Sequence, residues 1–333
     1  MQKYLSLFKN LLHAPVSIFS GKSSRRLPGN ASFLLSALLF CLVTLLPLPA
    51  SSDNPYLSTF FDIPLEYGKV VYRINENSPK QLYIIGISHR DPESGLNGST
   101  TIQTQADIFR IGEWLNRNRE LQLLLPEGYF TERKSSPAIT SQPSRGQLDN
   151  FLLRQKLADE SRFVNAEMLL MENIHMRASQ VEDRNIYNAV CTSLRNLKTP
   201  GTPISSPKEK IEQLQYLQEV RTAMLLQKIP SVIDYELHNG TIKNQSAMLT
   251  IGLNHIQDIV RYFQKDGIDI DTPASADIQP TSYQTELNLL KMGYGVTIII
   301  PRTLVDDSKL LQLTNIDRIL LAYSSQTGKE WMN

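Results

Sequence analysis

Two histidines stand in matching positions of the sequence, each at the end of an apolar run. His89 closes YIIGISH at residues 83–89, and His255 closes LTIGLNH at residues 249–255. An imidazole can bind a metal ion or act as a base, and the glycine three residues earlier permits close approach of a ligand. Either histidine alone is interpreted as an ordinary hydrogen-bonded loop residue. Because the pattern occurs twice, a functional site that contains both histidines is a second interpretation.

A carboxylate is expected at the same place. Glu127 follows the apolar run LQLLL, at residues 121–125, in a Pro-Glu-Gly turn. If the three runs are parallel strands, their carboxyl ends meet at one edge of the sheet, where ligands bind in open α/β folds. Two imidazoles and one carboxylate leave coordination positions for water on a divalent metal. The alternative is that Glu127 only caps its tight turn.

The segment VEDRNIYNAV, at residues 181–190, adds polar candidates at the start of a predicted helix. Arg184 can bind a carbonyl or phosphate oxygen through two parallel hydrogen bonds, and Asp183 can orient a histidine. The alternative is a solvated helix start with Asp183 near its cap. His175 and His238 are expected on the surface or in a turn and receive no role.

The elements that must position these residues alternate between strands and helices. Apolar runs predict strands at residues 69–74, 81–87, 121–125, 247–252 and 293–301, and periodic segments predict helices at 104–119, 208–228 and 256–264. Residues 316–323 are expected to add an edge strand. The order strand, helix, strand is typical of a parallel crossover. The sequence therefore predicts one α/β domain over residues 57–330, with a mainly parallel sheet, two related halves and a helical insertion at about 148–240.

Taken together, these motifs resemble those of the TraB/GumN, PrgY and Tiki superfamily, which is related to erythromycin esterases and ChaN-like haem-binding proteins. The similarity is carried by GISHRDPES, LLLPEG, RNIYNAV and LTIGLNHI, and it extends over about residues 65–325. It implies an α/β fold of two repeated halves. It also implies a site made from His89, Glu127, Arg184 and His255. Arg90 and Asp258 depart from the family pattern, since Asp258 stands where a glycine is usual.

The branches of this superfamily imply different functions. Tiki-like members are metal-dependent proteases, erythromycin esterases activate water with a histidine, and TraB and PrgY members are linked to peptide-pheromone shutdown. We therefore expect a hydrolase acting on a peptide or ester. His89, Glu127 and His255 would hold a divalent metal that lowers the pKa of its bound water, and Arg184 would stabilise the oxyanion.

Two alternatives to a hydrolase stay open. One is a non-catalytic module that binds a peptide, or binds haem through His89 or Tyr129, as ChaN-like members bind haem. The other is a structural family member whose site is degenerate and which is anchored by residues 31–50.

The N-terminal part predicts a membrane connection. Residues 31–50, ASFLLSALLFCLVTLLPLPA, carry no charge, and residues 1–30 form a segment with five basic and no acidic side chains. Such an apolar segment can cross a bilayer as a helix, and its basic flank predicts a cytoplasmic N-terminus. Cleavage as a signal peptide near Ala50 and retention as a membrane anchor are both open. Either way, the main domain is expected outside the cytoplasm, in the cell envelope.

Composition excludes several other classes. The formal net charge is +1, without a basic patch, so no nucleic-acid partner is expected; the expected partners are the membrane and a peptide or small-molecule substrate. No Gly-x-Ser-x-Gly, phosphate-binding loop, His-Glu-x-x-His or Cys-x-x-Cys occurs. Cys41 lies in the apolar segment, which leaves Cys191 without a partner for an internal disulfide.

Overall fold

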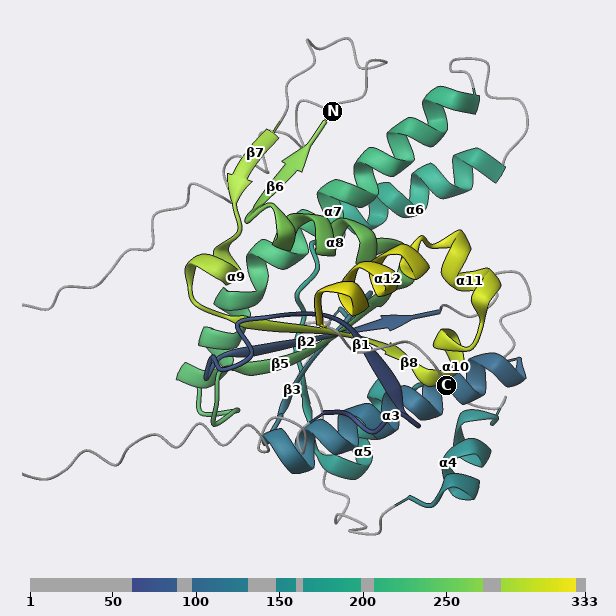
Figure 1. Ribbon diagram of the computed structural model, residues 1–333, viewed down its shortest axis with the longest axis vertical. Helices are drawn as coiled ribbons and strands as arrows, with labels where there is room; N and C mark the ends of the chain where they lie inside the picture. Colours follow the sequence, from purple (N-terminus) through teal and green to yellow (C-terminus); the bar gives the residue numbers. More distant parts are fainter. Residues whose placement is uncertain are drawn as a thin grey trace, which may run out of the picture. The chain divides into compact units, whose positions relative to one another are not determined.

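The computed structural model describes residues 62–88, 98–130, 148–159, 164–198, 207–271 and 283–327. From Ile63 onward these residues belong to one compact unit, Ile63–Asn333. It has an α/β fold with a mostly parallel sheet, which confirms the predicted α/β class and mainly parallel sheet (Figure 1). The apolar segment 31–50 lies outside the described residues, and among those described no helix is long and apolar enough to cross a membrane.

The central sheet has six strands in the order β1-β8-β2-β5-β3-β4. Their bounds are β1 Gly68–Ile74, β2 Gln81–Ile87, β3 Leu123–Pro126, β4 Arg177–Ala178, β5 Ser246–Gly252 and β8 Gly295–Pro301. β1 is antiparallel to β8, and the other pairs are parallel. Every residue of β5 and β8 is buried, because helices cover both faces of a parallel sheet.

The two central strands, β2 and β5, are neighbours, and the chain leaves them in opposite directions. From β2, helix α3 (Ser99–Arg119) leads to β3, beyond β5. From β5, helix α8 (Leu253–Gln264) begins the path to β8, beyond β2. Because parallel crossovers are right-handed, paths in opposite directions must cover opposite faces, and Figure 1 shows α3 and α8 on opposite faces. The carboxyl ends of two such strands are the usual ligand position in an open α/β sheet.

The remaining helices form a layer on each face of the sheet (Figure 1). With α3 lie α4 (Asn150–Leu157) and α5 (Ala166–Ile174), and their apolar side chains pack against β2, β3 and β5 in one buried cluster. The opposite layer contains α7 (Pro207–His238), α8 and α12 (Ile316–Thr327), and α6 (Arg184–Lys198) packs along α7. The shorter elements are β6 Gly267–Ile270, β7 Tyr283–Glu286, α9 Asn288–Lys291, α10 Arg302–Val305 and α11 Ser308–Leu313.

The edge strand predicted at residues 316–323 is wrong, because this segment is the first two turns of α12. Ile316 and Leu320 are buried, whereas Leu321 is 64% exposed. Buried residues four apart beside an exposed one match the helical period, not the alternation of a strand. Because most residues of this segment are apolar, the sequence does not show which of them are buried, and the helical spacing cannot be recognised from it.

Helix α7 continues ten residues beyond its predicted end at 228, to His238, with Pro230 inside it. A proline within a helix removes one hydrogen bond and usually ends the helix. Here Ile229 and Ile233, on either side of the proline, are fully buried. Tertiary packing of this apolar face therefore outweighs the local cost.

Gly86 in β2 makes room for α8. A Cβ atom at this position would lie 2.7 Å from Leu253 Cδ2 and 2.8 Å from Ile300 Cδ1. Because the glycine has no side chain, the first turn of α8 can lie directly on the sheet. The space beside Gly86 is thus taken by α8 rather than by a ligand.

Candidate functional site

Glu127 is fixed at the carboxyl edge of the sheet, one residue beyond β3. Its backbone N–H donates to the carbonyl of Thr250 in β5, at 2.9 Å, which extends the strand pairing by one residue. Its side-chain Oε2 accepts a 2.6 Å hydrogen bond from the backbone N–H of Gly252. Gly128 then turns the chain with φ 71°, a conformation that favours glycine. Backbone and side chain together therefore hold the Glu127 carboxylate against the end of β5.

Arg221 of α7 neutralises this carboxylate. Its Nη2 lies 2.7 Å from Glu127 Oε1, and the same nitrogen donates to Glu182 Oε1. Only 9% of Arg221 is exposed. Burial disfavours its charge, but Glu127 and Glu182 outweigh burial and raise the pKa of Arg221. One guanidinium thus holds two buried carboxylates.

Glu182, two residues before the start of α6, is the more deeply buried acid, with 2% exposed. Burial raises the pKa of its carboxyl group; Arg221 acts in the opposite direction, and the nearby charge of Glu127 adds to the rise. A buried, hydrogen-bonded acid of this kind anchors the start of α6 to α7.

His255 lies in the first turn of α8 and faces the same carboxylate. Its side chain is 7% exposed, and Nε2 lies 3.7 Å from Glu127 Oε1. That separation is too long for a direct hydrogen bond and suits a bridging water. The other ring nitrogen, Nδ1, lies 2.6 Å from the hydroxyl of Thr222 on α7. The structure therefore brings Glu127 and His255 together. The Arg221 side chain extends from α7 to the same carboxylate at the edge of the sheet.

Arg184 does not join this cluster. It is exposed in the first turn of α6, where its guanidinium lies over the ring of Phe130 at 4.9 Å. Phe130 in turn meets Tyr187 edge to face at 5.0 Å, and Arg221 lies over Tyr187 at 5.1 Å. The two arginines are thus linked only through aromatic rings.

Arg221 is the residue that the sequence interpretation missed. It occurs in EVRTAMLL, inside a predicted helix, between residues whose side chains are buried, Val220 and Ala223. A charged residue within an apolar stretch of a helix is the signal that can reveal such a position, because an arginine there needs a buried acid.

A second charged cluster lies one helical turn from His255. Arg261 Nη2 contacts Asp258 Oδ1 at 3.1 Å and also donates to Glu219 of α7. Burial, reinforced by the charge of Glu219, raises the pKa of Asp258 to about 6, against the opposing effect of Arg261 and His255. The Arg261 guanidinium of α8 is therefore shared by one carboxylate of its own helix, Asp258, and one of α7, Glu219.

The described residues do not by themselves fit a divalent metal ion. Among them, no group of three His, Cys, Asp or Glu side chains is placed to hold one. Both oxygens of Glu127 already accept hydrogen bonds, and a guanidinium 2.7 Å from Oε1 repels a cation there. His89, the third predicted ligand, lies outside the described residues, as does Arg90; β2 ends at Ile87, whose Cα partner in β5 is Gly252.

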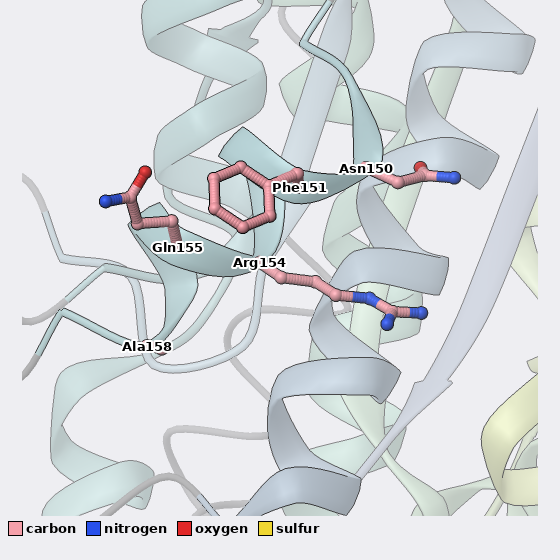
Figure 2. A pocket seen from close by; sticks show the side chains of 5 residues that line it. All are labelled: Asn150, Phe151, Arg154, Gln155 and Ala158. Atoms are coloured by element: carbon pink, nitrogen blue, oxygen red, sulfur yellow. The ribbon is translucent and has the colours of Figure 1, made fainter.

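A hollow elsewhere on the molecule does not compete with this site. It has a volume of about 710 Å³, and the described residues that line it belong to α4 and its C-cap: Asn150, Phe151, Arg154, Gln155 and Ala158 (Figure 2). Figure 2 shows Asn150 and Arg154 extending to the same side, and Asn150 accepts hydrogen bonds from Arg110 of α3. Binding sites need polar groups that converge from several elements, and this hollow has none of the acids or histidines described above.

Comparison of the chain with protein-family models, curated proteins and solved structures finds no match.

Proposed function

We propose that the chain is a hydrolase of the TraB/Tiki type that acts on a peptide or an ester. The observation that carries the proposal is the 3.7 Å approach of His255 Nε2 to Glu127 Oε1 at the carboxyl edge of β3 and β5. A base and a carboxylate at this edge are the parts that water-activating chemistry needs.

The reaction would begin with a water bound between His255 Nε2 and Glu127 Oε1, since polar atoms 3.7 Å apart can share one water. As the water oxygen attacks the substrate carbonyl, its proton moves to His255 Nε2. When the carbon–nitrogen or carbon–oxygen bond breaks, His255 returns that proton to the leaving group. Glu127 orients the water and stabilises the transient imidazolium.

Arg221 is a positioning residue in this scheme. It holds Glu127 Oε1 at 2.7 Å and is itself held by Glu182, so the carboxylate cannot rotate away from His255. The carboxylates of Glu127 and Glu182 raise the pKa of Arg221 against the effect of burial and so favour its charged form. Arg184, exposed on α6, is proposed to contact the substrate rather than the reacting atoms.

The metal-dependent form of the proposal depends on His89. A divalent metal held by His89, Glu127 and His255 would supply a water of lowered pKa, and Arg221 would have to withdraw from Glu127 Oε1 to admit it. Metal analysis of the purified full-length protein separates the two forms. A stoichiometric metal that is lost in His255→Ala favours this form, and a metal-free protein with full activity favours the metal-free form.

The resemblance also motivates two finer proposals. Each of the adjacent central strands β2 and β5 is followed by a helix, α3 or α8, on the way to another strand of the sheet, which supports a fold of two related halves, although β6, β7 and α9 also lie between α8 and β8. Residues 31–50 are proposed to export or anchor the domain in the cell envelope. Fractionation of cells followed by N-terminal sequencing of the mature chain tests the second point: a cytoplasmic, unprocessed protein contradicts it.

The central experiment measures hydrolysis of a panel of peptides and esters by full-length protein. We expect His255→Ala to lower kcat by about 10²–10⁴-fold, the usual contribution of general acid–base catalysis. Glu127→Gln is expected to lower it similarly, while the matched control His238→Ala, at the end of α7, keeps the wild-type rate. Equal activity of all three variants would sink the proposal. Binding of a peptide or of haem without turnover favours the non-catalytic alternative.

A further inference from the structure

The hydroxyl of Thr222 links the backbone of α7 to the ring of His255. Thr222 is completely buried, and its Oγ1 lies 2.8 Å from the carbonyl oxygen of Gln218, one turn earlier in the same helix. The same Oγ1 lies 2.6 Å from His255 Nδ1. Both distances are short enough for hydrogen bonds.

A hydroxyl group has only one proton to donate, so these two contacts cannot both be donated by Thr222. A carbonyl oxygen can only accept, and threonine hydroxyls within helices commonly donate to the carbonyl four residues earlier. The Thr222 proton therefore goes to Gln218. The contact with His255 is then a bond in which the ring Nδ1–H donates and Thr222 Oγ1 accepts.

This assignment decides which nitrogen of the neutral ring is basic. With the proton on Nδ1, the Nε2 atom carries a lone pair. Nε2 is the nitrogen 3.7 Å from Glu127 Oε1, a distance at which no hydrogen bond to the carboxylate holds a proton on it. The free lone pair thus faces the carboxyl edge of the sheet.

We propose that Thr222 is a positioning residue that holds His255 in the Nδ1–H tautomer and so keeps Nε2 available to accept a proton. The role rests on the proposed hydrolase site, but the tautomer is a property of the resting protein. It can be measured whether or not a substrate has been found.

The test is ¹⁵N NMR of the histidine rings in full-length protein at pH 8. The chain has five histidines, and His255→Gln identifies the signal that belongs to His255. We expect an Nδ1–H tautomer in the wild type and in Thr222→Ser, which keeps the hydroxyl. Thr222→Val, which keeps the shape and loses the acceptor, is expected to shift the ring toward Nε2–H.

An Nε2–H or doubly protonated ring in the wild type overturns the proposal, and so does a tautomer that is unchanged in Thr222→Val. Circular dichroism checks that the valine variant folds; if it does not, the wild-type and serine spectra decide alone.

Kinetics separate this proposal from the proposed function. With a hydrolysed substrate, Thr222→Val is expected to lower kcat about 10–100-fold with little change in KM, and Thr222→Ser to restore most of it, as for other residues that orient a catalytic histidine. A loss confined to KM contradicts the positioning role. If no substrate is turned over, the hydrolase proposal fails while the NMR result still decides the tautomer.

Discussion

At the scale of single residues, the buried guanidinium of Arg221 compensates the negative charges of Glu127 and Glu182. Arg221→Ala would leave Glu127 and Glu182 buried without their counter-charge. Breaking a buried ion pair in this way costs about 3–5 kcal/mol. We expect that loss in the free energy of unfolding, measured by urea denaturation at pH 7.

Arg184→Ala is the matched control, because Arg184 also stacks on an aromatic ring but is exposed. An exposed cation–π contact contributes about 0.5–1 kcal/mol, so this variant should lose far less stability. Equal losses in the two variants would show that Arg221 does not hold the cluster together.

Asp258 makes stability depend on pH in a predictable direction. Its pKa of about 6 in the folded protein exceeds the ordinary value of 3.8, so the folded state binds a proton more tightly than the unfolded state. The stability contributed by protonated Asp258 is complete below about pH 4 and is lost as the pH rises through 6. A pKa difference of this size between the two states corresponds to roughly 2–3 kcal/mol of unfolding free energy.

Asp258→Asn should remove this dependence. We expect the variant to gain stability relative to wild type between pH 4 and pH 7, by up to about 2 kcal/mol in urea denaturation. Asp306→Asn provides the comparison, because Asp306, at the C-cap of α10, also pairs with an arginine, Arg302, but is more exposed than Asp258. If the difference in unfolding free energy between wild type and Asp258→Asn does not change between pH 4 and pH 7, the raised pKa of Asp258 is contradicted.

The sequence directs attention to Glu127 and His255 because both follow apolar runs in short, local motifs. Its hint of Arg221 is a charge within an apolar stretch of helix, but it does not indicate the partners, Glu127 and Glu182, which lie 94 and 39 residues away in the chain. Local pattern favours Arg184 instead, because it starts a helix near other polar residues. Long-range pairing of charges depends on how helices pack, and one sequence does not contain that information in local form.

At the scale of elements, Gly86 sets how closely α8 approaches the sheet. Gly86→Ala would place a Cβ atom 2.7 Å from Leu253 and 2.8 Å from Ile300. Overpacking of this kind typically costs about 1–3 kcal/mol, and here the ends of the buried Leu253 and Ile300 side chains must shift. We expect that destabilisation by thermal unfolding, together with a change in the environment of His255, two residues beyond Leu253.

Gly98→Ala serves as the control, since a Cβ atom at Gly98 meets nothing within 4 Å. It should leave both stability and the His255 signal close to wild type. If Gly86→Ala behaves in the same way, α8 is free to adjust and the glycine has no packing role.

Strands and helices differ in how well local patterns predict them here. Buried strands such as β8 are continuous apolar runs, so their positions follow directly from composition. The segment of α12 is also apolar, but only its i and i+4 positions are buried, and the run is too short for that period to stand out. Which residues of a short apolar run are buried distinguishes a helix from a strand, and that burial depends on the rest of the fold.

At the scale of the whole molecule, the α/β class and the parallel sheet follow from the alternation of elements, but the strand order does not. Sequence order places β1 beside β2, whereas β8 lies between them in the sheet. The position of β8 results from the second crossover, which returns over β2. The strand order depends on which faces of the sheet the helices can cover, and this is determined by the packing of the whole domain.

The bond from Gly252 N–H to Glu127 Oε2 makes the carboxylate part of the sheet as well as part of the site. A related protein without the reaction would still gain stability from keeping the acid, since its removal would take away the partner of the Gly252 N–H at the end of β5. Inheritance of this glutamate among relatives would therefore say little about activity. Substitution at Thr222 or His255 would be more informative, because their hydrogen bond orients the imidazole and does not hold the sheet together. Loss of this pair in a relative would therefore indicate loss of the reaction.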